Sequence, residues 1–258
     1  MNFNKTFSIL YAMKIFGFRE NKKHINLKSF RNIIANSIIG LVLIAMVSLT
    51  YAGGTLNAFS QVDDSPIYNG NLNSNKISLM LNVYWGNEYL EDILNTLKEN
   101  QVTTTFFLGG MWVEKYPELA KMILDDGHEI ANHGYFHKDQ DILNLDGNAK
   151  EISDCHKIVK NTLGVEMNLF APPSGAFSDK TIKAAKNLNY KTIMWTRDTI
   201  DWRDKDENII YTRATNNAKG GDLILMHPTE ATAKALPKII KELKNQGFTL
   251  TTVTDCLS

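Results

Sequence analysis

Hydrophobic and polar residues follow two alternating periods from residue 76 to residue 245. Residues 76–83 (KISLMLNV) form a short, mostly apolar run typical of a buried strand. Residues 89–100 place Leu90, Ile93, Leu94 and Leu97 at the spacing of one helical face. Further strands are predicted at 103–108, 128–131, 191–195 and 223–226, and further helices at 117–126, 148–163, 179–188 and 234–245. This alternation predicts an α/β domain with parallel strands and crossover helices.

Polar residues come directly after several of these predicted strands. His133 follows 128–131, Asp198 follows 191–195, and His227 follows 223–226. A (β/α) barrel gathers its functional residues at the strand ends in this way. We therefore expect a barrel rather than an open sheet.

A long uncharged segment, residues 33–52, follows a basic N-terminal segment. Residues 1–32 contain seven Lys and Arg residues against one acidic residue, Glu20, for a net charge of +6 within a chain of net charge zero. A segment as long as 33–52 spans a bilayer core as a helix, and the basic excess keeps its N-terminal side in the cytoplasm. We expect a basic cytoplasmic segment at 1–32, a transmembrane anchor at 33–52, and an extracytoplasmic location for everything after Ala52.

Two other interpretations of residues 33–52 are a cleaved signal peptide and a buried core helix. Ala52 is a small residue where a peptidase could cut, but the basic and apolar regions are longer than in a usual signal peptide. A core helix rarely combines such an uncharged length with an adjacent basic block. Residues 53–74, rich in Gly, Asn, Ser and Asp, read as a linker to a folded domain at 75–258.

The two cysteines and the net charge add two expectations. Cys155 and Cys256 lie in the part expected outside the cytoplasm, where a disulfide can form. The sequence leaves their pairing open, and because neither has metal or redox spacing we expect two buried thiols. A net charge of zero gives no indication of a nucleic-acid partner.

The strongest chemical signal is the segment 132–137 (NHGYFH), in which His133 and His137 are four positions apart. Two histidines on one face can bind one divalent cation, although paired surface histidines are common. Four further segments accompany this pair: LMLNVYWG at 79–86, APPSG at 171–175, DTIDW at 198–202, and LMH at 225–227.

In this order, the five segments resemble the five motifs of the polysaccharide deacetylase (NodB-homology, carbohydrate esterase 4-like) family. The resemblance covers about residues 76–256 and is greatest to the membrane-anchored, sporulation-type deacetylases of Gram-positive spore formers. It implies a distorted (β/α) barrel of the NodB type, preceded by one transmembrane helix. It also implies an N-acetylated glycan such as peptidoglycan as the partner, and a weakly held divalent metal, zinc or cobalt, as the cofactor.

The resemblance also implies roles for individual residues. His133 and His137 correspond to the two histidine metal ligands, and His227 corresponds to the acid that protonates the leaving amine. The segment that supports this acid corresponds to Asp198, Asp201 and Trp202, and one wall of the sugar groove to Pro172, Pro173 and Gly175. The aromatic residues Tyr84, Trp85 and Tyr135 either line that groove or pack at the barrel mouth.

Three positions depart from the family pattern. Asn82 stands where the family has its general-base Asp, Val83 where it has its metal-binding Asp, and Ala171 where it has an Arg that pairs with the base. An Asn amide is not a useful base, and general-base assistance contributes roughly 10²–10⁴ in rate. The metal also loses its anionic ligand, so two neutral imidazoles would hold zinc less tightly.

Two hypotheses follow for function. In the first, the protein is a weakened or remodelled metal-dependent N-deacetylase, in which Asp139, Asp198 or Asp201 supplies a carboxylate. In the second, it is a catalytically inactive relative that keeps the groove as a glycan-binding or morphogenetic module in sporulation. An unrelated α/β domain is a third interpretation, which five ordered motifs disfavour.

Overall fold

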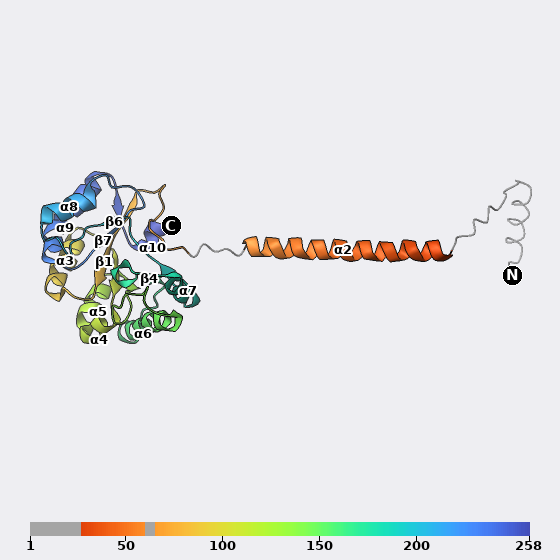
Figure 1. Cartoon of the computed structure of the whole chain (residues 1–258). Coiled ribbons are helices and arrows are strands. Elements are labelled where there is room, and N and C mark those ends of the chain that lie inside the picture. Colours follow the sequence, from red (N-terminus) through yellow and green to blue (C-terminus); the bar gives the residue numbers. More distant parts are fainter. Residues whose placement is uncertain (1–26, 60–64) are drawn as a thin grey trace, which may run out of the picture. The chain divides into compact units, whose positions relative to one another are not determined.

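The computed structural model describes residues 27–59 and 65–258, and the chain divides into two units. In the first unit, helix α2 (Leu27–Phe59) contains a window, Phe30–Ser48, that is long and apolar enough to cross a membrane (Figure 1). The helix continues past the predicted end of the span at Ala52. The part of the predicted basic segment before residue 27 lies outside the described residues.

The second unit is built on one parallel sheet with the strand order β5-β4-β3-β2-β1-β7-β6, in which β8 also pairs with β1. The strands are β1 (Lys76–Val83), β2 (Thr105–Leu108), β3 (Glu129–Asn132), β4 (Leu169–Phe170), β5 (Lys191–Thr192), β6 (Arg197–Asp198), β7 (Leu223–Met226) and β8 (Thr249–Leu250). The edge strands β5 and β6 are consecutive in the chain and are separated only by residues 193–196. The five Cα–Cα steps from Thr192 to Arg197 span at most about 18 Å, so the sheet curls until its two edges approach each other.

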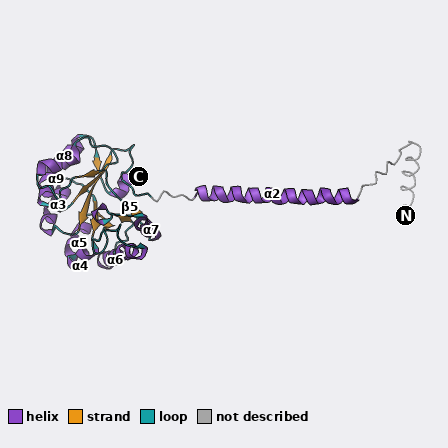
Figure 2. Cartoon of the chain, viewed as in Figure 1, coloured by secondary structure: helices purple, strands orange, loops and turns teal. Residues whose placement is uncertain are grey.

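Helices surround this curled sheet, as the purple ribbons around the orange strands show (Figure 2). They are α3 (Asn87–Glu99), α4 (Gly110–Lys115), α5 (Pro117–Asp125), α6 (Leu145–Leu163), the 3₁₀ turn η1 (Pro173–Gly175), α7 (Asp179–Asn187), α8 (Glu207–Thr215), α9 (Glu230–Asn245) and α10 (Val253–Leu257). The predicted α/β fold with a parallel, barrel-like sheet is therefore confirmed, as a curled half-barrel.

Strand β1 separates two apolar clusters. Leu81 and Val83 belong to the cluster between the sheet and the helices, whereas Met80 belongs to the cluster inside the curled sheet. Side chains alternate between the two faces of a strand. Asn82 therefore lies on the inner face, and Val83 lies on the face that packs against the helices.

Residues 65–74, which we predicted as linker, are part of the folded domain. Ile67 forms a bridge with Ile193, and the Gly70 N–H donates to the Gly221 carbonyl oxygen at 2.7 Å. Backbone hydrogen bonds attach this segment to the domain. Such bonds require no hydrophobic periodicity, so the sequence pattern does not show that the segment is folded. The two cysteines are both buried free thiols, as predicted.

Candidate active site

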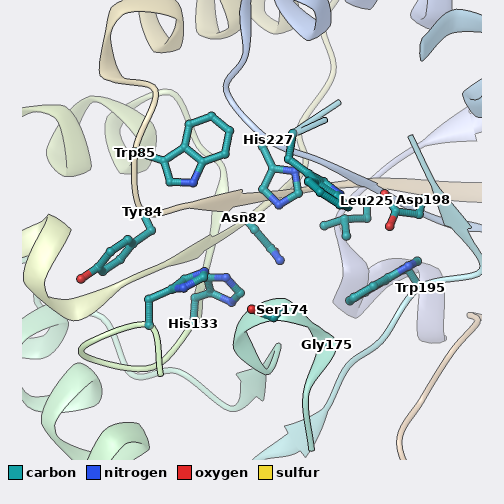
Figure 3. Close-up of a pocket in the computed structure, with 12 residues that line it drawn as sticks. Asn82, Tyr84, Trp85, His133, Ser174, Gly175, Trp195, Asp198, Leu225 and His227 are labelled. Atoms are coloured by element: carbon teal, nitrogen blue, oxygen red, sulfur yellow. The ribbon is translucent and has the colours of Figure 1, made fainter. Parts of the chain in front are cut away.

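A pocket of about 360 Å³ opens at the carboxyl ends of the strands. Its lining residues lie at or just after the ends of six different strands, as expected for a barrel site. They are Asn82, Tyr84, Trp85, His133, His137, Ser174, Gly175, Trp195, Asp198, Trp202, Leu225 and His227 (Figure 3). The structure thus brings together the histidines of two motifs that lie about ninety residues apart in the sequence.

His133 and His137 lie side by side in this pocket after β3, with their ring centroids 5.0 Å apart. The Nδ1–H of His133 donates to the Ala171 carbonyl oxygen at 2.8 Å, which leaves Nε2 as the unprotonated nitrogen of the neutral ring. Burial, with the neighbouring His137, lowers the pKa of His133 to about 3. Burial also lowers the pKa of His137. Both rings are therefore neutral near pH 7, the state in which imidazole binds metals.

His227 is held by a buried carboxylate. Its Nδ1–H donates to Asp201 Oδ1 at 2.8 Å, and its backbone N–H donates to Asp201 Oδ2 at 2.7 Å. The Thr232 hydroxyl also donates to Oδ2. Trp85 stacks on the His227 ring with centroids 5.7 Å apart. These contacts orient His227 and occupy both oxygens of Asp201, which supports the predicted role of Asp201 as a partner of His227 rather than a base.

The end of β1 provides no carboxylate to the pocket. Asn82 lines the pocket and is 4% exposed, whereas Val83 is fully buried in the cluster beneath the helices. Ala171 is also fully buried. Across residues 27–59 and 65–258, no group of three or more His, Cys, Asp or Glu side chains is placed to hold a metal ion. Catalytic zinc sites usually have three protein ligands, so the described residues do not fit the expected zinc or cobalt ion.

The remaining carboxylates considered as substitutes do not change this conclusion. Asp198 lines the pocket, and its Oδ1 accepts a hydrogen bond from the Ile200 N–H at 2.7 Å. Asp139 is exposed and is not among the residues that line the pocket. Neither joins His133 and His137 in a three-ligand group.

Aromatic side chains form the walls of the pocket. Trp85 and Trp202 are 43% and 55% exposed, so each indole has surface open to a ligand. Trp195, which the sequence analysis did not single out, packs against Gly175: a Cβ at this glycine would lie 2.6 Å from the indole. Gly175 also has φ 66°, in the region that favours glycine. The position of Trp195 at the end of a predicted strand was the available signal.

Three residues predicted in the groove are not among those that line this pocket. Tyr135 does not line the pocket, because its hydroxyl donates to Glu114 and its ring packs against Phe136. Pro172 and Pro173 are buried behind the lining residues Ser174 and Gly175. The 3₁₀ turn that begins at Pro173 exposes only its later residues to the pocket.

Glu151 on α6 supports the loop that carries His137, and the sequence motifs gave no signal for it. It is 3% exposed, and its Oε2 accepts the backbone N–H groups of Tyr135 and Phe136 at 3.0 and 2.7 Å. Its Oε1 pairs with Lys138 at 3.1 Å. His137 itself has φ 55°, a conformation that non-glycine residues adopt rarely. A buried carboxylate from a distant helix thus shapes this loop.

Comparison with known proteins gives a consistent result. A family model for polysaccharide deacetylase matches residues 69–193. The Bacillus subtilis peptidoglycan-N-acetylmuramic acid deacetylase PdaA is 32% identical over 211 residues, 80% of each chain. The uncharacterized protein YlxY of Bacillus subtilis is 42% identical over 192 residues, which are 74% of this chain and 60% of YlxY.

Among solved structures, a CE4 family pseudoenzyme from Bacillus anthracis has a TM-score of 0.75 and 38% identity, covering 76% of this chain and 70% of its own. A mutant of that pseudoenzyme, described as having restored enzymatic activity, has the same TM-score, with 36% identity over 76% and 72% of the two chains.

Proposed function

The chain belongs to the polysaccharide deacetylase family, and from this premise we propose that it binds N-acetylated cell-wall glycan in the strand-end pocket without hydrolysing it. One observation carries the proposal. The pocket keeps the aromatic walls and the His227–Asp201 pair, but an amide, Asn82, occupies the position where hydrolysis requires a base. The protein would therefore retain recognition and lack turnover.

The loss of catalysis follows from the chemistry of the pocket floor. Amide hydrolysis needs a group that removes a proton from the attacking water, and this assistance contributes roughly 10²–10⁴ in rate. Asn82 is not basic, and both oxygens of Asp201 are already engaged by His227 and Thr232. The similarity to a solved pseudoenzyme of the same family agrees with this proposal.

The retained binding follows from the shape and the walls of the pocket. A cavity of about 360 Å³ accommodates a sugar unit, and exposed indole faces such as those of Trp85 and Trp202 suit the apolar face of a pyranose ring. The relatives named as peptidoglycan deacetylases suggest that this glycan is peptidoglycan.

The apolar window of α2 supports a location at the cell membrane. We propose that α2 is an uncleaved anchor whose basic N-terminal side faces the cytoplasm, so that the domain meets the cell wall on the outer side. A role in sporulation remains a prediction from the sequence resemblance.

A remodelled deacetylase is the second candidate, and the intact His227–Asp201 pair favours it. In that case His133 and His137 would hold a metal with a further ligand from solvent or substrate. The two candidates differ in acetate release, which only the second predicts.

The test uses the full chain in detergent, with an oligomer of N-acetylglucosamine and added zinc or cobalt. We expect glycan binding by calorimetry and no acetate release above that of a His133→Ala variant. Trp202→Ala should weaken binding by roughly tenfold, as expected for the loss of one aromatic contact, whereas Ile142→Ala, at an exposed position outside the pocket, should have no effect. Acetate release that His133→Ala abolishes would establish the remodelled deacetylase instead, and a folded chain with neither activity would refute both candidates.

A further inference from the structure

The floor of the pocket contains an amide with unused hydrogen-bonding capacity. Asn82 is 4% exposed, and its Oδ1 is buried without a hydrogen-bond partner in the described part of the chain. Figure 3 shows its side chain pointing into the space bounded by His133 and Leu225. The buried Oδ1 is out of reach of a ligand, so the group that Asn82 presents to the pocket is the amide nitrogen at the tip of its side chain, which can donate a hydrogen bond.

The residues immediately around this amide include no carboxylate. Leu225 is 3% exposed beside it, and Val83 and Ala171, at the positions where the family carries charge, are fully buried apolar residues. Among the twelve residues that line the pocket, Asp198 contributes the one carboxylate. Figure 3 places Asp198 past Leu225, away from the tip of Asn82. A cationic group at the floor would therefore lose its hydration without gaining an adjacent counter-ion.

We propose that this pocket distinguishes the acetylation state of the glycan, holding a hexosamine with an N-acetyl group and rejecting the same sugar with a free amine. The inference rests on the proposed glycan-binding function and adds the chemical group that is recognised. The Asn82 amide nitrogen points into the pocket and can donate to the C=O of an acetamide, whereas an ammonium group has only donors and offers it no acceptor. A carboxylate at this position would accept hydrogen bonds only and would attract an ammonium group.

Two physical effects favour the acetylated sugar over the sugar with a free amine. A site that hydrogen-bonds a ligand group discriminates strongly against analogues without that group, because its own buried polar atoms are then left unpaired. The ammonium group of a deacetylated sugar adds the cost of burying a charge. The protein would accordingly bind glycan that has not been deacetylated and release it after a deacetylase has acted.

The test compares three tetramers on the full chain in detergent by calorimetric titration, at about pH 6, where amino groups of this kind carry a proton. The first is the N-acetylglucosamine tetramer, the second its fully deacetylated form, and the third the glucose tetramer, which is neutral and has no acetamide. We expect the acetylated tetramer to bind at least about tenfold more tightly than either of the others, with the deacetylated form the weakest.

Two variants assign the selectivity to Asn82. Asn82→Asp keeps the side-chain volume and supplies a carboxylate, so the preference for the acetylated over the deacetylated tetramer should shrink by about tenfold or invert. Asn82→Leu removes both hydrogen-bonding groups, so the acetylated tetramer should lose affinity while the glucose tetramer keeps its own. Thermal unfolding confirms that each variant is folded.

Two results would overturn the inference. Equal affinity for the acetylated and deacetylated tetramers, or a preference that Asn82→Asp leaves unchanged, refutes the acetylation selectivity while the proposed glycan-binding function stands. No binding of any tetramer by the folded native chain refutes the glycan-binding function and, with it, the inference. The comparison on the native chain decides the question even if a variant does not fold.

Discussion

Substitutions of two adjacent residues at the end of β1, Asn82 and Val83, should affect zinc binding differently. Asn82 lines the pocket with His133 and His137, whereas Val83 packs in the cluster beneath the helices. Asn82→Asp therefore adds a carboxylate beside two neutral imidazoles and completes three candidate ligands, the number that catalytic zinc sites use. Val83→Asp places its carboxylate in an apolar core.

The expected magnitudes differ accordingly. A ligand present at 100 times its Kd stabilises the folded state by about 2.7 kcal/mol. For a domain of this size that corresponds to a rise in Tm of roughly 5–10 °C. Val83 is fully buried, so Val83→Asp loses apolar packing and desolvates a carboxyl group, which should lower the free energy of unfolding by at least about 3 kcal/mol.

The assay is thermal unfolding of the full chain in detergent, with and without zinc, for the native chain, each single variant and the double variant. Asn82→Asp should show a zinc-dependent rise in Tm that His133→Ala removes. Val83→Asp should show a lowered Tm that zinc does not change. Acetate release is the second readout: Asn82→Asp supplies a carboxylate to the pocket and should increase any activity, whereas adding Val83→Asp should not increase it further.

An equal zinc response of the two single variants would refute the reasoning, since it would mean that Val83 reaches the pocket. The absence of any response in Asn82→Asp would also refute it, because the side chains of residues 82, 133 and 137 could not then converge on one ion.

Two further predictions concern support for the site and pH dependence. Glu151→Ala removes the acceptor for two backbone N–H groups. It should lower the free energy of unfolding, measured in urea, by about 2–4 kcal/mol and weaken glycan binding, measured by calorimetry. Glu151→Gln should recover most of the stability and most of the binding. Burial lowers the pKa of His128 from its ordinary value of 6.5 to about 4, so between these pH values the unfolded chain binds a proton that the folded chain does not. The free energy of unfolding should therefore fall as pH decreases through this window, by up to about 3 kcal/mol for this residue; His128→Gln should make the dependence of the urea midpoint on pH shallower, and an unchanged slope would contradict the assignment.

The longer elements were predictable because their hydrophobic periods are clear. The strand predicted at 76–83 matches β1, and the helix predicted at 89–100 overlaps α3 (Asn87–Glu99). The two-residue strands β4, β6 and β8 were not predicted, since two residues show no period. The strand predicted at 191–195 is shorter in the structure, where β5 covers only Lys191–Thr192. The residues after it connect the two edges of the sheet.

The candidate site was predictable where a motif carried the chemistry. His133, His137 and His227 were named from the sequence, and the structure brings them into one pocket. Glu151 and Trp195 were not named, because each acts through a contact with residues that are distant in the sequence. No local pattern records such a contact.

The sequence by itself determined the class of the fold, the family motifs and the missing carboxylates, because each depends on residue type and spacing along the chain. The tertiary structure decided which of these residues share a pocket and which face the core. Asn82 and Val83 are adjacent in sequence, yet one lines the pocket and the other packs beneath the helices. That difference arises because a strand turns successive side chains to opposite faces, and only the curled sheet specifies what each face meets.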